Sequence, residues 1–254
     1  LLTSDVNIGN QKGDEWADKI ISELKTMPNV IVKNRSQVFG YYDHNMLVMS
    51  ERVSDHLPNT EKYIPKQRLW YIRAKEVIIS SGSIERPLVF GNNDTPGVML
   101  SSAAKEYIKI YGVLVGKKPL IFTNNDSGYE TAIEFKKNGI DPIILDTRKN
   151  PSSDIITEAK NLSITIKYSH VVVAAKGYKK VRSADIAEIS EDKKVLGKIE
   201  NISCDCICVS GFWTPTIHLA SQSGSKSVFK KEIDAFVPSK PKQNETTVGS
   251  ANGI

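Results

Sequence analysis

Apolar residues recur along this chain at two spacings, and stretches of each spacing alternate. Helical periodicity and turn residues predict helices at 16–24, 101–111, 129–137 and 154–160. Short apolar, β-branched runs predict strands at 30–32, 67–73, 76–80, 119–122, 142–146, 164–175, 195–199 and 204–209. We expect Ser101 or Ser102 to cap the second helix and Gly112 to end it. Strands that alternate with helices predict an α/β fold.

Three extended segments run into turns built from small or flexible residues. The first turn is Ser80, Ser81, Gly82 and Ser83, the second holds Gly211, Phe212 and Trp213, and the third ends in Asn252 and Gly253. Small residues let another group approach the backbone, and open α/β sheets bind ligands at the carboxyl ends of their strands. These residues form the candidate binding site. Each turn alone also fits an ordinary strand exit, and Trp213 also fits a packed aromatic ring.

A further candidate segment precedes the first turn. Val38 and Phe39 lie in an extended stretch that leads into turn residues at 43–45. A hairpin tip with packed aromatic side chains explains this stretch, and so does a loop that lines a nucleotide pocket. Both interpretations stay open at this point.

The stretch 119–146 reads as strand, turn, helix and strand, which is the βαβ unit of dinucleotide-binding domains. Asp146 ends the second strand about 20 residues after the turn, where such domains place the acid that binds a ribose. The turn TNNDSGY, however, keeps only Gly128 where the fingerprint needs three glycines. Asp126 in that turn would also repel a pyrophosphate. We therefore expect a scaffold that kept the fold and lost the nucleotide site.

Composition narrows the possible partners. The 254 residues carry a formal net charge of +5, with 40% hydrophobic and 25% charged residues. Basic and aromatic residues do not interleave as they do on nucleic-acid surfaces. No apolar run approaches the roughly 20 residues that span a membrane. We expect neither a nucleic acid nor a membrane as a partner.

The positions of the cysteines, and the absence of acid–base or nucleophile pairs in the sequence, limit the kinds of reactive site that we expect. Cys204, Cys206 and Cys208 alternate, so in a strand they would share one face with Cα atoms roughly 7 Å apart, too far for an easy disulfide. No second Cys or His cluster completes a metal site. We expect buried free thiols, no metal and a cytoplasmic location. No acid–base or nucleophile pair stands out, so we expect no catalytic residue here.

The three turns, placed around the 119–146 unit, resemble the flavoproteins with two dinucleotide-binding domains, the disulfide-reductase-like oxidoreductases. A closer resemblance is to the α subunits of heterotetrameric sarcosine oxidases. It covers nearly the whole chain and rests on FGYYDHN at 39–45, RLWYIRAKEV at 68–77, IERPLVFGNNDTPGVM at 84–99 and IFTNNDSGY at 121–129. Because the chain opens at Leu1 without Met, we expect a central part of such a subunit, with a strand and a glycine-rich turn upstream.

The resemblance implies two Rossmann-like, FAD/NAD(P)-binding domains, the first incomplete at its N-terminus. Residues 1–114 with 202–254 would form the first domain. Residues 115–201 would form an inserted second domain with a degraded glycine motif.

The resemblance also implies an activity, the oxidative demethylation of sarcosine to glycine. The one-carbon unit passes to tetrahydrofolate, and hydrogen peroxide is produced. NAD would be held by this subunit, FAD and FMN would serve the assembled enzyme, and tetrahydrofolate would bind a domain outside this chain. The implied partners are the β, γ and δ subunits of a heterotetramer.

The resemblance assigns roles to the candidate residues. Val38 and Phe39 would pack near the adenine, Ser81, Gly82 and Ser83 would approach the nucleotide through their backbone, and Asn252 and Gly253 would close the pocket. Two other functions stay open. A subunit of another amine or opine flavin oxidoreductase shares this architecture, and the damaged TNNDSGY turn favours a non-catalytic scaffold.

Overall fold

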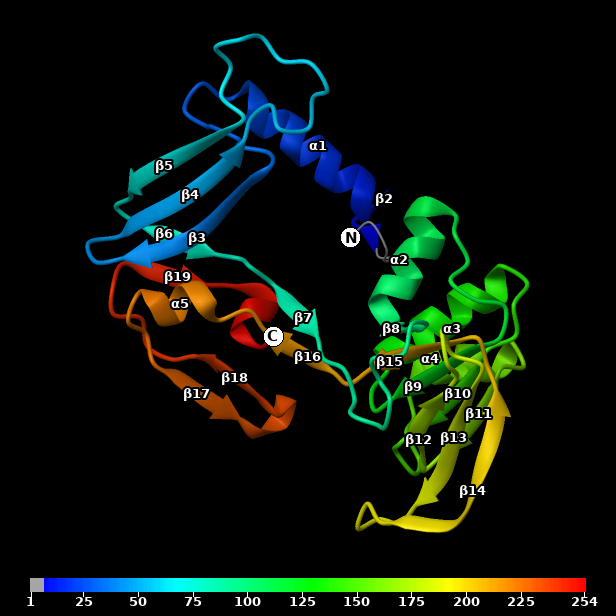
Figure 1. The fold of residues 1–254 in the computed structure, drawn as a ribbon. Coiled ribbons are helices and arrows are strands. Elements are labelled where there is room, and N and C mark those ends of the chain that lie inside the picture. Colours follow the sequence, from blue (N-terminus) through cyan, green and yellow to red (C-terminus); the bar gives the residue numbers. More distant parts are fainter. Residues whose placement is uncertain (1–6) are drawn as a thin grey trace. The chain divides into compact units, whose positions relative to one another are not determined.

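The computed structural model describes residues 7–254, which form two units (Figure 1). Of the described residues, the first unit contains 7–84 together with Thr214–Ile254, and the second is Glu85–Trp213. The second unit is therefore inserted into the first. Residues 85–114 and 202–213 belong to this inserted unit, because two of its central strands, β8 and β15, come from those stretches.

The first unit is built from short elements around a small core. Its helices are α1 (Gly13–Thr26) and α5 (His218–Gln222), with 3₁₀ turns η1 (Lys231–Ile233) and η2 (Gly249–Asn252). Its strands are β1 (Asn7–Ile8), β2 (Gln11–Lys12), β3 (Ser36–Tyr42), β4 (Met46–Arg52), β5 (Gln67–Arg73), β6 (Val77–Ile79), β17 (Ser227–Lys230), β18 (Ala235–Pro238) and β19 (Glu245–Thr247). β3, β4 and β5 form an antiparallel meander, whereas β6 and β19 are a parallel pair. The buried core contains Tyr41, Val77, Ile79 and Ala220.

The inserted unit has three layers. Its parallel central sheet has the order β11-β10-β9-β15-β8, from β8 (Val98–Leu100), β9 (Pro119–Thr123), β10 (Ile143–Asp146), β11 (Thr165–Tyr168) and β15 (Cys206–Ser210). One face packs against α2 (Ser101–Tyr111), α3 (Ser127–Lys137) and α4 (Asp154–Asn161). The other packs against an antiparallel sheet of β12 (His170–Lys176), β13 (Ser183–Ile189) and β14 (Val195–Ser203). The short strands β7 (Ser83–Glu85) and β16 (Trp213–Pro215) pair separately.

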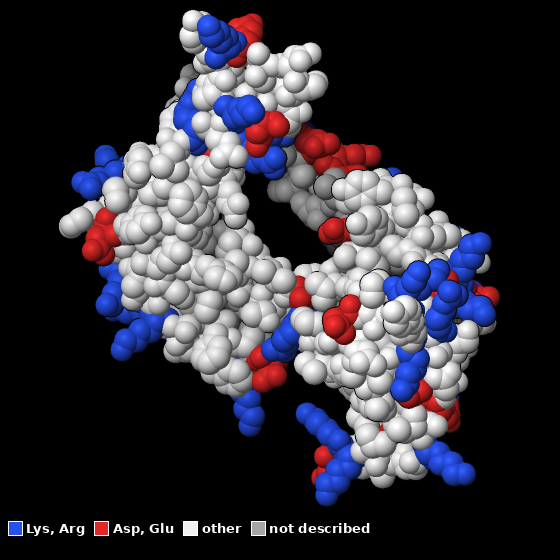
Figure 2. Space-filling model, viewed as in Figure 1, with Lys and Arg blue, Asp and Glu red and all other residues white. Residues whose placement is uncertain are grey.

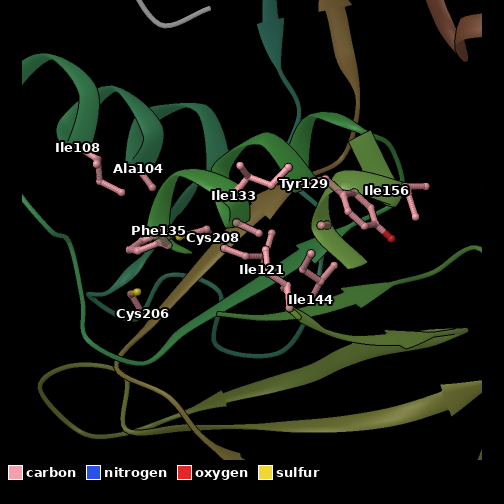
Figure 3. Packing of buried hydrophobic residues seen from close by; sticks show 13 residues of the cluster. Ala104, Ile108, Ile121, Tyr129, Ile133, Phe135, Ile144, Ile156, Cys206 and Cys208 are labelled. Carbon is pink, nitrogen blue, oxygen red and sulfur yellow. The ribbon is translucent and has the colours of Figure 1, made fainter. Parts of the chain in front are cut away.

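Alternate residues of the central strands enter different cores. On the helix side, Ile121, Ile144, Cys206 and Cys208 pack with residues of α2, α3 and α4 (Figure 3). On the other side, Leu120, Phe122, Leu145, Ile207 and Val209 pack with the antiparallel sheet. Because strands buried on both faces need apolar residues at every position, the runs read as continuous rather than alternating in the sequence.

The cysteines are free and buried, as expected from their spacing. Cys206 and Cys208 share the helix side of β15, but Cys204 lies before the strand and packs in the other core. The prediction of one shared face was therefore wrong for Cys204. Burial raises the pKa of its thiol to about 12, so it stays neutral and acts as a small apolar side chain.

Most predicted elements are present, with two corrections. Residues 30–32 form no strand. The run 164–175 divides into β11 and β12, which belong to different sheets, because Ser169 between them has a left-handed backbone (φ 53°). Strand β13 did not stand out in the sequence, since Asp185 and Glu188 interrupt its apolar pattern.

The start of α2 is stabilised by a residue that is distant in sequence. Gly112 ends this helix in a left-handed conformation (φ 63°), as expected, but neither Ser101 nor Ser102 caps it with a side chain. Instead, a carboxylate oxygen of Glu85 accepts the Ser102 N–H at 2.7 Å. Glu85 is 3% exposed, so its carboxylate lies inside the unit at the positive end of the helix dipole.

Substitution of Glu85 by Ala removes this bond and the charge at the helix end. We expect the first turn of α2 to lose about 1–2 kcal/mol of stability and its amides to exchange hydrogen faster. Glu106→Ala, on the exposed side of the same helix, is the matched control and should leave exchange unchanged. Unchanged exchange in both variants would contradict the capping role.

Candidate functional site

Two of the three candidate turns lie together at one sheet edge of the first unit. β6 and β19 are parallel, with Ile79 opposite Thr247, so both strands end at the same edge. The Val248 N–H donates to the Ile79 carbonyl at 2.9 Å and extends the pairing. The chain then leaves β6 at Ser80 and enters η2 after β19. The first and the last candidate turns therefore form a single edge.

Backbone contacts hold the first turn in place. Ser81 Oγ donates to the Thr216 carbonyl at 2.9 Å, and the Thr216 N–H donates to the Gly82 carbonyl at 2.9 Å. Gly82 is left-handed (φ 73°), and a Cβ built there would lie 3.9 Å from Ser250 Oγ. Gly82 is thus required by its backbone conformation and not by crowding. Sequence reasoning missed Thr216 and Ser250, because no local pattern marks a contact made across the fold.

This edge presents polar groups that have no partner. The backbone N–H groups of Ser80, Ser81 and Gly82 donate to no acceptor within the described residues 7–254. Within the same range the side-chain amide of Asn252 makes no hydrogen bond. Gly253 is fixed by Lys230, whose Nζ donates to its carbonyl at 3.0 Å. Successive free N–H groups favour anionic or carbonyl oxygens, so the edge is suited to a polar ligand.

Val38 and Phe39 lie on β3 of the same unit. The Phe39 side chain is 48% exposed, and its carbonyl accepts Gln222 Nε2 of α5 at 3.4 Å. Gln222 Oε1 in turn accepts the Tyr41 N–H at 3.0 Å. Across the part of the chain that the structure describes, no hydrogen bond joins Val38 or Phe39 to the turn 80–83. Their place beside the nucleotide stays a prediction.

The second candidate turn belongs to the inserted unit. The Gly211 N–H donates to the Arg86 carbonyl at 2.6 Å, and a Cβ at Gly211 would also lie 2.6 Å from that oxygen. Phe212 has φ 84°, and its carbonyl accepts the Arg86 N–H at 2.8 Å. Trp213 Nε1 donates to Ser127 Oγ at the start of α3, at 2.8 Å. Close packing of chain against chain explains the small residue at 211.

The carboxyl edge of the inserted unit is closed by its own side chains. Asp146, fully buried at the end of β10, accepts the Tyr129 hydroxyl at 2.7 Å and Arg148 Nη2 at 2.8 Å. Arg148 Nη1 also pairs with Asp126, just before α3, at 2.8 Å. One arginine thus links the turn that would hold a phosphate to the acid that would hold a ribose. Arg148 was not predicted, although its position two residues after Asp146 is visible in the sequence.

The same contacts shift two pKa values. Burial, and then the hydrogen bond to Asp146, raises the pKa of Tyr129. Burial alone would lower the pKa of Arg148, but the hydrogen bonds and charges of Asp146 and Asp126 raise it. At neutral pH Arg148 therefore stays a cation and Tyr129 a neutral donor.

Gly128 keeps the packing role of its motif. A Cβ at this position would lie 2.6 Å from Thr123 Cβ, so only glycine lets α3 approach β9 this closely. β9, α3 and β10 form the expected parallel βαβ unit. The fold of this unit is confirmed, while its loss of nucleotide binding stays a prediction.

The described residues were also compared with the features of metal sites, membrane-spanning helices and charged surfaces. Among residues 7–254 no group of three or more His, Cys, Asp or Glu side chains could hold a metal ion. The described helices include none with the length and apolar character needed to cross a membrane. On the face shown in Figure 2, Lys and Arg side chains lie near Asp and Glu. Ion pairs such as Lys109 with Glu134 and Lys137 with Glu158 also bring opposite charges together in the inserted unit.

Comparison with curated sequences decides the family. The chain is 36% identical over 253 residues to sarcosine oxidase subunit alpha of Rhizobium meliloti (strain 1021), and 32% identical over 250 residues to that of Corynebacterium sp. (strain P-1). This chain belongs to the sarcosine oxidase alpha subunit family. The matches cover 99% and 97% of this chain but 24% and 26% of the relatives, so it spans about a quarter of their length. No family model matches the chain.

Solved structures confirm the predicted fold class. Thioredoxin reductase of Lactococcus lactis matches with a TM-score of 0.69 and 16% identity over 99% of this chain and 77% of that one. L-proline dehydrogenase from P. horikoshii matches with a TM-score of 0.63 and 18% identity over 98% of this chain and 43% of that one. At such identities the likeness shows the disulfide-reductase-like fold alone.

The variant Arg148→Ala tests whether the ion pairs at the carboxyl edge stabilise the inserted unit. Arg148→Ala leaves a fully buried carboxylate without its cation, and we expect the unit to lose roughly 3 kcal/mol of stability, measured by denaturant unfolding. Lys149→Ala, which breaks an exposed pair with Glu191, is the control and should have a much smaller effect. Adding Asp146→Asn to Arg148→Ala should recover part of the loss. Equal stabilities of the Arg148 and Lys149 variants would contradict the argument.

Proposed function

We propose that this chain forms part of the alpha subunit of a sarcosine oxidase and that its first unit holds NAD. The observation that carries the proposal is the identity of 36% to a sarcosine oxidase alpha subunit along almost the whole chain. The activity would be the oxidative demethylation of sarcosine to glycine, with transfer of the one-carbon unit to tetrahydrofolate and formation of hydrogen peroxide. FAD, FMN and the β, γ and δ subunits would belong to the assembled enzyme, in the cytoplasm.

The proposed NAD site is the edge formed by the turns 80–83 and 248–253. The free N–H groups of Ser81 and Gly82 suit the oxygens of a pyrophosphate, and a left-handed glycine there gives the ligand access to the backbone. Asn252, in the turn that follows β19, adds a side-chain amide without a hydrogen-bond partner among residues 7–254. Ser83, Val38 and Phe39 complete the proposed site, as the family resemblance implies. NAD is a hydride carrier, and the role of these residues would be to bind and orient it.

The inserted unit is the less suitable place for NAD. Its phosphate turn carries Asp126, and the arginine that would attract a phosphate is held by two carboxylates. Gly211, Phe212 and Trp213 lie in this unit and pack against its own chain. We therefore propose the first unit as the nucleotide holder and the inserted unit as a scaffold.

Two neighbouring activities deserve comparison. A different amine oxidoreductase is supported by the fold match to a solved L-proline dehydrogenase. One of the similar solved structures is a bacillithiol disulfide reductase. Disulfide reduction is less well supported for this chain, because its three cysteines are free and buried, so none exposes a thiol.

The nucleotide released from the native complex by denaturation, identified by mass, tests the proposal. We expect NAD to be released, with one molecule of NAD for each copy of this subunit. Release of FAD without NAD from the complex would favour an ordinary reductase-like flavoprotein, and release of neither would favour a pure scaffold. Oxygen consumption with sarcosine, compared with proline, separates the two amine substrates.

Gly82→Val tests the position of the site within the native subunit. A β-branched residue strains the left-handed backbone of the turn and places methyl groups at the proposed contact, so we expect bound NAD to fall at least tenfold. Gly112→Val is the matched control, because Gly112 has a similar φ of 63° and open space around it but lies at the end of α2. Equal NAD content in the two variants would sink the assignment.

A further inference from the structure

The inserted unit contains a recess beside its closed nucleotide edge. The recess has a volume of about 800 Å³ and lies between the ends of β9 and β10 and the antiparallel sheet, with residues 88–90 along one side. Small-molecule sites occupy roughly 300–1,000 Å³. The carboxyl edge of a parallel sheet is also the usual place for a ligand in an α/β domain. Both size and position therefore suit a ligand site.

Most of the lining is apolar, and part of it is open to solvent. The buried rings of Phe90 and Phe122 contact each other edge-to-face, with centroids 5.9 Å apart. Val89 is 89% exposed, Val195 53% and Leu196 44%. Covering such side chains with an apolar ligand is favourable by about 25 cal/mol per Å² removed from water. The recess therefore favours a ligand with an apolar body.

Backbone hydrogen bonds fix the walls. The Gly91 N–H donates to the Val173 carbonyl, and the Ala175 N–H donates back to the Gly91 carbonyl, both at 2.8 Å. The Ile189 N–H donates to the Ser169 carbonyl at 2.7 Å. The segments on either side of the recess are thus tied to the antiparallel sheet, and the recess is formed before any ligand binds.

The lining of the recess contains two lysines and two glutamates, so its formal charges cancel. Lys149 pairs with Glu191 at 2.8 Å, which leaves Lys193 and Glu188. Neither of these two has an ion-pair partner in the described part of the chain. One ammonium and one carboxylate therefore remain available. A dinucleotide would bring several negative charges and find no free cation at the phosphate turn, because Arg148 is engaged there.

We propose that this recess binds a small zwitterion with an apolar body, such as an apolar amino acid or dipeptide. Lys193 receives the carboxylate of the ligand and Glu188 its ammonium group. The apolar body covers Phe90, Phe122 and Val195. This site lies within the inserted unit and does not rest on the proposed NAD site.

A set of three peptides with one apolar body tests the proposal. L-leucyl-L-phenylalanine carries both charges, its N-acetyl form lacks the ammonium, and its C-terminal amide lacks the carboxylate. Titration of the native protein is followed by methyl NMR of the valines and leucines, which also locates binding. We expect shifts at Val172 and Leu196 and at least tenfold weaker binding of each blocked peptide. Equal binding of all three, or no binding at millimolar concentration, overturns the proposal.

Charge variants assign the two ends of the ligand. Glu188→Gln and Lys193→Gln should each weaken binding of the free dipeptide at least tenfold, and both positions are exposed, so the fold should be kept. Lys193→Gln should not weaken binding of the amide further, because that peptide has no carboxylate to lose. Lys179→Gln, an exposed lysine outside the recess, is the control. If Glu188→Gln and Lys193→Gln bind as the control does, the proposed charge recognition is wrong.

Discussion

The need to neutralise one buried carboxylate determines what the inserted unit can do. Asp146 is completely excluded from water at the end of β10, and an unpaired charge there would be strongly destabilising. Arg148 supplies the cation, Tyr129 a hydrogen bond, and Asp126 engages the rest of the guanidinium. The side chains that a nucleotide site would use here, Arg148, Asp146 and Asp126, are therefore bound to one another. The stability of the unit and its capacity for that ligand compete for the same side chains.

The two units differ in which groups hold the candidate edge in place. In the first unit the Ser81 hydroxyl and the Gly82 carbonyl bond to Thr216, while the N–H groups of Ser80, Ser81 and Gly82 donate to no acceptor among residues 7–254. In the inserted unit the equivalent edge is held by side-chain ion pairs. A turn fixed from behind through its carbonyls and hydroxyls can still receive a ligand. A turn whose side chains pair with one another offers fewer groups to a ligand, and we therefore expect the first unit to be the better nucleotide site.

Local pattern was enough to predict strands such as β9, β10 and β15 and the βαβ unit. The continuous apolar runs of β9 and β15 belong to strands covered on both faces, and the left-handed Gly112 ended α2 as expected. What pattern could not provide was contact across the fold. Glu85 caps a helix 17 residues away, and Gly211 is small because of Arg86, 125 residues away. Such constraints arise only when distant segments meet, so no local signal marks them.

The buried side chains that could react in this chain serve its structure. Its thiols are buried, and the raised pKa of Cys204 keeps that thiol from acting as a nucleophile at neutral pH. Three buried acidic side chains, Asp146, Glu85 and Glu245, already accept hydrogen bonds from an arginine, a helix end and two serine hydroxyls. A proton-transfer group must be free to exchange its proton with a substrate, and these three are engaged in holding the fold. The buried thiols and carboxylates are therefore placed to hold the structure, in line with the proposed role of binding and orienting a nucleotide.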